Sequence, residues 1–188
     1  MNKKISTVLA IIVFAALLGA AFFAYNALYE SAYIPESTAE TIAEHHGLPL
    51  AADFAMEDAY GNEVRLSDFR GQPVVLNFWT TWCPSCVRET PHFENLYQEQ
   101  GDEIKILKVN LIGSRGETRE SVDAFMYAGG YTLPLYFDTE REGARAYNIT
   151  TIPATFFITA DGYLATTIHG SVTETTLAHG VKTAIRNR

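Results

Sequence analysis

A pair of cysteines directly after a buried strand constrains this chain most. Residues 74–79, reading VVLNFW, are apolar apart from Asn77 and have the β-branched and aromatic content of a central strand. A C-P-S-C motif at residues 83–86 follows three residues later. Pro84 suits the first turn of a helix, because its missing N–H would have no intrahelical partner there. The pattern therefore predicts a strand, a tight turn and a helix that starts at Cys83.

This placement favours redox chemistry at the two cysteines. The sulfur of Cys83 would face unpaired backbone N–H groups at the positive end of the helix dipole, which favours a thiolate. Cys86, one turn later, can close a disulfide onto it. A zinc half-site is less favoured, because the chain has only these two cysteines and no other ligand pair completes a tetrahedral set. A purely structural disulfide is also less favoured, since so short a loop gains little chain entropy. We predict a redox-active dithiol and no metal.

Several other segments match one protein family. They are Asp53-Phe54, Leu66–Gly71, Leu76–Trp79, Trp82–Cys86, Glu89, Pro91, Ile152–Ile158 and Asp161-Gly162. With these segments the chain resembles the thioredoxin superfamily, and within it the membrane-anchored ResA/TlpA-like thiol-disulfide oxidoreductases, over about residues 50–188. The resemblance implies an α/β thioredoxin-like fold. In this fold a central mixed sheet is flanked by helices, with an N-terminal hairpin and an inserted helix and strand over residues 118–138.

Three residues are the predicted catalytic set. Thiol-disulfide exchange needs an attacking thiolate and a second thiol that resolves the mixed disulfide. We assign the attack to Cys83 and the resolution to Cys86. Glu89 lies three residues after Cys86, on nearly the same helix face, and the resemblance implies that it is the active-site carboxylate. The alternative for Glu89 is a solvated side chain that is favoured only by the helix dipole.

The predicted substrate-binding residues lie beside or between the two cysteines, and they are Trp82, Pro84, Ile152 and Pro153. The resemblance implies a cis bond between Ile152 and Pro153 beside the disulfide, where the preceding backbone can pair with an extended substrate. Trp82 either offers an apolar docking surface or belongs to the core. Pro84 departs from the family pattern, in which proline commonly precedes the second cysteine. The redox potential therefore does not follow from the spacing alone.

The remaining elements follow from apolar periodicity and turn residues. We expect a hairpin over residues 52–64 and a turn over 66–71. Further strands are expected over 104–111, 135–137, 154–158 and 164–169. Helices are expected over 83–100, 118–128, 140–147 and 173–185, with a flexible loop over 113–117. Strands that alternate with helices imply a sheet with helices on both faces.

The N-terminus indicates an extracytoplasmic protein. Residues 5–24 are mostly apolar and follow Lys3 and Lys4. Their length is close to the ~20 residues that cross a bilayer, and the lysines would stay in the cytoplasm. We favour an uncleaved single-pass anchor in the cell membrane. A cleaved signal peptide is the alternative, because residues 19–21 are small. The chain then divides into an anchor or signal segment at 1–25, an extracytoplasmic tether at 26–49 and a thioredoxin-like domain at 50–188.

Composition narrows the partners. The formal net charge is −8, so we expect no binding to nucleic acid and no attachment to anionic lipid through a basic patch. Glycine loops that cradle phosphate are absent from the sequence, and we expect no cofactor.

The resemblance implies a function and leaves alternatives open. We expect a protein that reduces disulfides in other proteins, such as the heme-binding cysteines of apocytochromes c, with electrons drawn from a membrane thiol reductase. One alternative is an oxidant that forms disulfides, and another is a thioredoxin-fold peroxidase. A third is a copper-carrying assembly module in which His169 would join the two thiolates.

Overall fold

The computed structural model describes residues 16–25 and 47–187. The chain divides into two units, residues 1–43 and 44–188, and residues 16–25 of the first are helical. In the two described ranges no helix combines the length and the apolar character needed to cross a bilayer. The anchor and the tether predicted over residues 1–49 lie largely outside the described residues, and both stay predictions.

A seven-stranded mixed sheet forms the centre of the second unit. The strand order is β2-β1-β5-β4-β3-β6-β7. Strand β4 is parallel to β3 and β5, and every other pair is antiparallel. The strands are β1 (Ala55–Asp58), β2 (Glu63–Arg65), β3 (Val74–Trp79), β4 (Lys105–Asn110), β5 (Leu135–Phe137), β6 (Ala154–Ile158) and β7 (Leu164–His169). The predicted mixed sheet, with its N-terminal hairpin and its final hairpin of β6 and β7, is confirmed.

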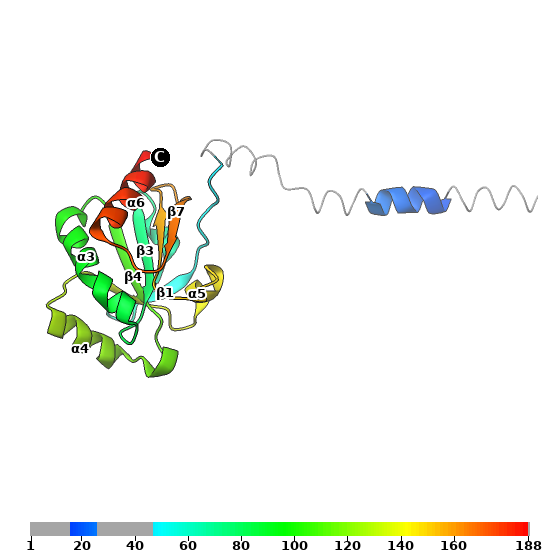
Figure 1. Cartoon of the computed structure of the whole chain (residues 1–188). Coiled ribbons are helices and arrows are strands. Elements are labelled where there is room, and N and C mark those ends of the chain that lie inside the picture. The colour runs from blue at the N-terminus through cyan, green and yellow to red at the C-terminus, as the bar shows by residue number, and fades with distance from the viewer. Residues whose placement is uncertain (1–15, 26–46, 188) are drawn as a thin grey trace, which may run out of the picture. The chain divides into compact units, whose positions relative to one another are not determined.

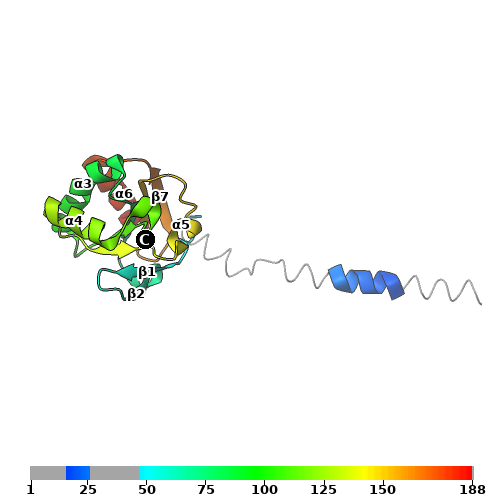
Figure 2. The same cartoon turned by 90° about the horizontal axis from the view of Figure 1, so that it is seen from below.

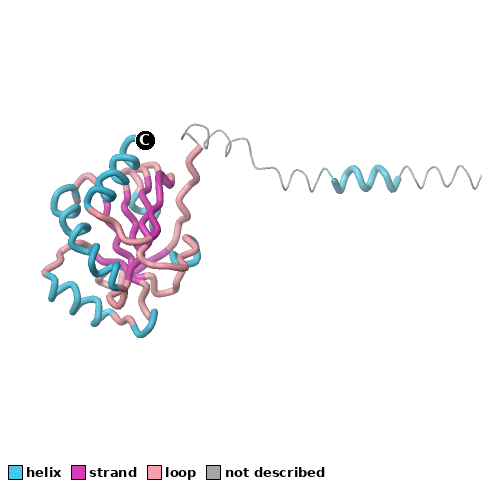
Figure 3. Tube along the Cα trace, in the orientation of Figure 1, coloured by secondary structure: helices cyan, strands magenta, loops and turns pink. Residues whose placement is uncertain are grey.

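Helices cover both faces of this sheet. They are α3 (Pro84–Gln100), α4 (Arg119–Gly129), α5 (Glu142–Ala146) and α6 (Glu174–Arg186), with 3-10 turns η1 (Leu66–Phe69) and η2 (Ser114–Gly116). Figures 1 and 2 place α3 and α6 on one side of the strands and α5 on the other. Side chains of α3, α4 and α6 share one apolar cluster, and α5 packs on a second. The strands are thereby enclosed between helices and loops (Figure 3).

Strand β3 lies inside the sheet and supplies both clusters. All six of its residues are buried, as the apolar run predicts. Successive side chains of a strand point to opposite faces, so Val75 and Trp79 enter the cluster under α3 while Leu76 and Phe78 enter the one under α5. Asn77 therefore points toward α3, where its amide is buried among apolar side chains. A buried amide has to be hydrogen-bonded, which makes this face of β3 the place to look for a polar network.

Two threonines set the starts of the later helices. The side chains of Thr118 and Thr173 accept hydrogen bonds from the backbone N–H groups three residues on, so they are N-caps and not helical residues. The helices predicted over 118–128 and 173–185 consequently begin one residue later. The loop expected over 113–117 contains the 3-10 turn η2, which the sequence pattern did not predict.

Gly180 in α6 yields a test of the packing under this helix. A Cβ atom at this position would overlap the ring of the fully buried Phe157, so the ring or the helix would have to shift. Alanine gains about 1 kcal/mol of helix propensity over glycine, but overpacking a tight core costs about 1–3 kcal/mol. We expect Gly180→Ala to lower the free energy of unfolding in urea.

Two variants check the cause. Thr175→Ala, at an exposed position of the same helix, should leave stability unchanged or slightly higher. Adding Phe157→Leu to Gly180→Ala should cost less than the sum of the two single changes, because the smaller side chain relieves the overlap. A Gly180→Ala protein as stable as the wild type would show that the helix and sheet are packed less closely than described.

Candidate redox site

The two cysteines lie where β3 ends and α3 begins. They form a disulfide with a Cα–Cα distance of 5.3 Å. Cys83 is the N-cap of α3, and its Sγ accepts a hydrogen bond of 3.2 Å from the backbone N–H of Cys86. Pro84 occupies the first helical position and is exposed. The sulfur of Cys83 therefore sits at the positive end of the helix, as predicted.

Burial distinguishes the two sulfurs. Cys83 keeps 5% of its surface exposed, whereas Cys86 has none. Of the two cysteines, only Cys83 therefore offers surface to an incoming disulfide. Attack by Cys83 and resolution by Cys86 stay predictions, and this asymmetry supports them.

The backbone before Pro153 lies beside the first sulfur. The Ile152–Pro153 peptide bond is cis, as the resemblance implies. The carbonyl oxygen of Ile152 lies 3.8 Å from the Sγ of Cys83. A substrate strand that reaches this sulfur would meet backbone of the loop before β6, which is where the predicted substrate contact lies.

Trp82 is held by the loop after β4. Its Nε1 donates a 2.9 Å hydrogen bond to the carbonyl of Ser114, and the guanidinium of Arg115 lies 4.4 Å from the centre of its ring. The side chain is partly buried against the cluster that includes both cysteines. Trp82 therefore packs on the core, and its role as a docking surface stays a prediction.

Glu117 ties this loop to the turn before the cysteines. Its buried carboxylate accepts hydrogen bonds of 2.7 Å from both the N–H and the hydroxyl of Thr81, and one of 2.8 Å from the amide of Asn110. No sequence pattern pointed to this residue. A glutamate between a glycine and a helix start is ordinarily solvated, so only the fold shows that it fixes the turn.

Glu89 is fully buried, so the solvated alternative for this side chain is wrong. Its carboxylate accepts hydrogen bonds of 3.0 Å from the amide of Asn77 and 2.9 Å from the backbone N–H of Val172. Burial raises the pKa of Glu89, and these donors together with the charge of Lys108 partly offset that rise. A carboxyl with a raised pKa keeps its proton to a higher pH than a solvated carboxyl, and a positioned carboxyl can exchange a proton with a reacting group.

Lys108 is a second ionisable group on this face, and it is not among the residues predicted from the sequence. Its Nζ donates a 3.0 Å hydrogen bond to the Oδ1 of Asn77 and lies 4.6 Å from the ring centres of Trp79 and Phe93. Complete burial lowers the pKa of Lys108 to about 7, against the opposing effect of Glu89. The available signal was a lysine within a run that otherwise reads as a buried strand.

Asn77 links the cation to the carboxylate. Its oxygen accepts from Lys108, and its nitrogen donates both to Glu89 and, at 3.0 Å, to the hydroxyl of Thr155. The sheet register creates this row, because Asn77 pairs with Lys108 on one side and Thr155 on the other. The network reaches α3 at Glu89, one turn after Cys86. It can therefore hold a proton near the buried cysteine.

Lys108→Met yields a test of this coupling. The change removes the positive charge that lowers the pKa of Glu89, so that pKa should rise further. If the carboxylate form of Glu89 is needed for activity, the acidic limb of the pH–rate profile should move up by about one unit. Lys105→Met, at the partly exposed start of the same strand, is the control and should leave the limb in place. An unmoved limb in Lys108→Met would separate Lys108 from the reaction.

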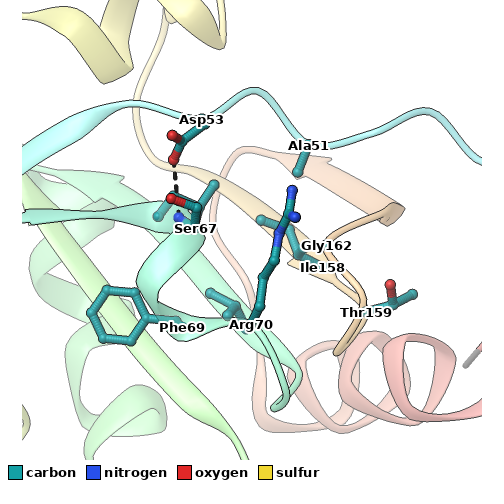
Figure 4. A pocket seen from close by; sticks show the side chains of 10 residues that line it. Ala51, Asp53, Ser67, Phe69, Arg70, Ile158, Thr159 and Gly162 are labelled. Atoms are coloured by element: carbon teal, nitrogen blue, oxygen red, sulfur yellow. Dashed lines mark hydrogen bonds between the residues drawn. The ribbon is translucent and has the colours of Figure 1, made fainter.

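A pocket elsewhere in the fold is distinct from this site. Figure 4 shows Asp53, Ser67 and Arg70 around it, and the N–H of Ser67 donates to the carboxylate of Asp53. Val74 and Ile158 also line it. Val74 begins β3 and Ile158 ends β6. The pocket therefore lies at the opposite end of these strands from the cysteines. Asp53 there fixes the segment before β1 to η1, which explains why Asp53 and Ser67 belong to the resemblance.

His169 is not placed to join the cysteines. Its ring packs edge-on against Phe156, with the ring centres 6.1 Å apart. Phe156 belongs to the cluster under α5, whereas both cysteines belong to the cluster under α3. The histidine that the copper alternative requires therefore lies on the other face of the sheet.

Known proteins share this arrangement of sequence and fold. Residues 49–167 match the AhpC/TSA family. Thiol-disulfide oxidoreductase ResA of Geobacillus kaustophilus is 41% identical over 127 residues, which are 66% of this chain and 70% of that protein. ResA of Bacillus subtilis is 35% identical over 136 residues, which are 72% of each chain. The solved structure of StoA from Bacillus subtilis has a TM-score of 0.61 at 32% identity, and it covers 70% of this chain and 97% of that one.

The matched segment runs from the residues just before β1 into β7, so it includes the strand, the turn and the helix that carry the dithiol. The resemblance drawn from short motifs thus extends over most of the second unit. The chain belongs to the AhpC/TSA family of thioredoxin-like proteins, and it is a thiol-disulfide oxidoreductase.

Proposed function

We propose that this oxidoreductase works as a reductant of disulfides in other proteins on the extracytoplasmic side of the membrane. One observation carries the chemistry: in the disulfide at the start of α3, Cys83 keeps 5% of its surface accessible, while Cys86 has none and lies one turn from Glu89. This geometry suits an exchange in which one cysteine meets the partner and the second closes the cycle.

The exchange runs in two steps. In the reduced enzyme the Cys83 thiolate attacks one sulfur of the substrate disulfide, and the other substrate sulfur leaves and takes up a proton. The Cys86 thiol then gives its proton to Glu89 and attacks the Cys83 sulfur. This step releases the second substrate sulfur as a thiolate, which takes up a proton from solvent, and it leaves the enzyme disulfide. Two electrons pass to the substrate, and an external dithiol must return them.

Glu89 can act as the proton acceptor that the second step needs. Cys86 is fully buried, and an apolar environment disfavours a thiolate. A carboxylate on the same helix face can accept the proton while Cys86 attacks. Its bonds to Asn77 and Val172 hold it in place.

The cellular role extends this chemistry. We infer attachment to the cell membrane through residues 5–24, with Lys3 and Lys4 in the cytoplasm. Apocytochrome c is the proposed substrate and a membrane thiol reductase the proposed electron donor. The support for both is the resemblance to ResA/TlpA-like proteins.

Equilibration of the Cys83–Cys86 couple with glutathione or dithiothreitol tests the direction. A reductant should have a potential below about −250 mV, whereas a potential near −120 mV is typical of a strong oxidant. The reduced protein should also reduce a peptide disulfide with the C-x-x-C-H spacing of a heme-binding site. A potential in the oxidant range, or rapid peroxide consumption without peptide reduction, would overturn the proposed reductant function.

A further inference from the structure

Two arginines contact the residues next to the dithiol. The guanidinium of Arg115 packs on the ring of Trp82, directly before Cys83. Arg88, on α3, donates a 2.9 Å hydrogen bond to the hydroxyl of Ser85, between the two cysteines. Both arginines are exposed. We call Arg88 and Arg115 the basic rim.

Two acidic side chains of the same region are turned into the fold. Glu89 and Glu117 are buried, and their carboxylates accept the hydrogen bonds described above. Neither carboxylate pairs with the rim. Among the described residues, Arg115 has no hydrogen-bond or ion-pair partner, and its guanidinium lies 4.4 Å from the ring centre of Trp82. The N–H groups around its edge stay available to a ligand.

The backbone at Arg115 requires an explanation. Residues 113, 115 and 116 all have positive φ, of 74°, 50° and 82°. Glycine occupies two of these positions, as the left-handed conformation favours, but the third is an arginine. A β-carbon costs free energy there, and such strain tends to be kept at functional positions. The result is a guanidinium held over the tryptophan that precedes the attacking cysteine.

We propose that the basic rim recognises carboxylates, so that the enzyme prefers protein disulfides flanked by aspartate or glutamate. This inference rests on the proposed function and names the substrate class for it. A guanidinium edge matches a carboxylate in shape and charge. The rim is a local exception, because the chain as a whole carries a net charge of −8 and would attract basic peptides. A preference for acidic substrates would therefore be the opposite of the preference expected from the net charge.

Three synthetic peptides test the preference. They share one disulfide loop and carry aspartate, asparagine or lysine on both sides of it. With the reduced full chain at low salt, we expect the aspartate peptide to be reduced about tenfold faster than the lysine peptide. The ratio should shrink at 0.5 M salt, at which charges are screened within about 5 Å.

Variants locate the cause. Arg115→Asn removes the charge with a residue that tolerates the left-handed backbone, and the aspartate-to-lysine rate ratio should fall at least threefold, about 0.7 kcal/mol at room temperature. The double variant Arg88→Gln with Arg115→Asn should abolish the preference for the aspartate peptide or reverse it. Arg141→Asn is the matched control, because Arg141 is also exposed with positive φ but precedes α5 on the other face of the sheet. It should leave the ratio unchanged.

The outcomes separate the two proposals. The proposed role of the basic rim would be overturned if all three peptides were reduced at the same rate. It would also be overturned if Arg141→Asn lost as much of the preference as Arg115→Asn. Either result would leave the reductase function standing. Failure of the wild type to reduce any of the peptides would overturn the proposed function itself.

Discussion

Cys86→Ser is expected to turn the enzyme into a trap for its substrates. Cys83 keeps its small accessible surface at the start of α3 and still attacks, but no second thiol is present to resolve the mixed disulfide. Catalytic turnover should fall to background. Mass spectrometry of the variant incubated with a peptide disulfide should show an adduct with the mass of the bound peptide, and dithiothreitol should remove it.

Cys83→Ser is the matched control for this trap. The remaining thiol of Cys86 has no exposed surface, so this variant should be inactive and form no adduct. Both single changes keep the size of the side chain and remove the disulfide equally. Adduct formation by Cys83→Ser and not by Cys86→Ser would reverse the two roles. That result would also mean that α3 opens during the reaction.

The strand, turn and helix of the site were predictable because their signals are local. The apolar run of β3, the cysteine spacing and a proline in the first helical position all lie within 13 residues, 74–86. Each signal acts on its immediate neighbours, and tertiary packing does not change its meaning here. The bounds of β3 agree with the expected ones, and so do those of β5, β6 and β7.

The network around Glu89 was not predictable in this way. Lys108 meets Asn77 only through the parallel pairing of β4 with β3, and the backbone of Val172 arrives from beyond β7. Such contacts join residues far apart in the sequence, so no short pattern contains them. The role of Glu89 came from the resemblance alone, and the resemblance did not include Lys108. A charged residue in an otherwise apolar strand was the signal that could have pointed to it.

The same contrast applies to the loop after β4. Its glycines indicated a loop, but the sequence did not show that Glu117 would turn inward to hold Thr81 while Arg115 turned outward over Trp82. The loop therefore does two things for the site. One side chain fixes the turn that positions Cys83, and another sets the charge that an approaching substrate meets.

Glu89→Gln is expected to have the largest effect among changes that spare the cysteines. Glutamine keeps the size of the side chain and can accept a hydrogen bond from Asn77 or Val172, but it cannot take a proton from Cys86. We expect reduction of a peptide disulfide at neutral pH to slow by about a hundredfold, with loss of the acidic limb of the pH–rate profile. Glu99→Gln, at an exposed position of α3, should leave both unchanged.

Stability measurements give an independent test of the same side chain. The pKa of Glu89 in the folded protein is raised by burial, so the folded state holds this proton more tightly than the unfolded state. The contribution of Glu89 to stability should be greatest below its unfolded pKa and should be lost as pH rises through the folded pKa. Glu89→Gln should therefore flatten this part of the dependence of the unfolding free energy on pH. A variant with wild-type rates and a wild-type stability curve would exclude Glu89 as the proton acceptor for Cys86.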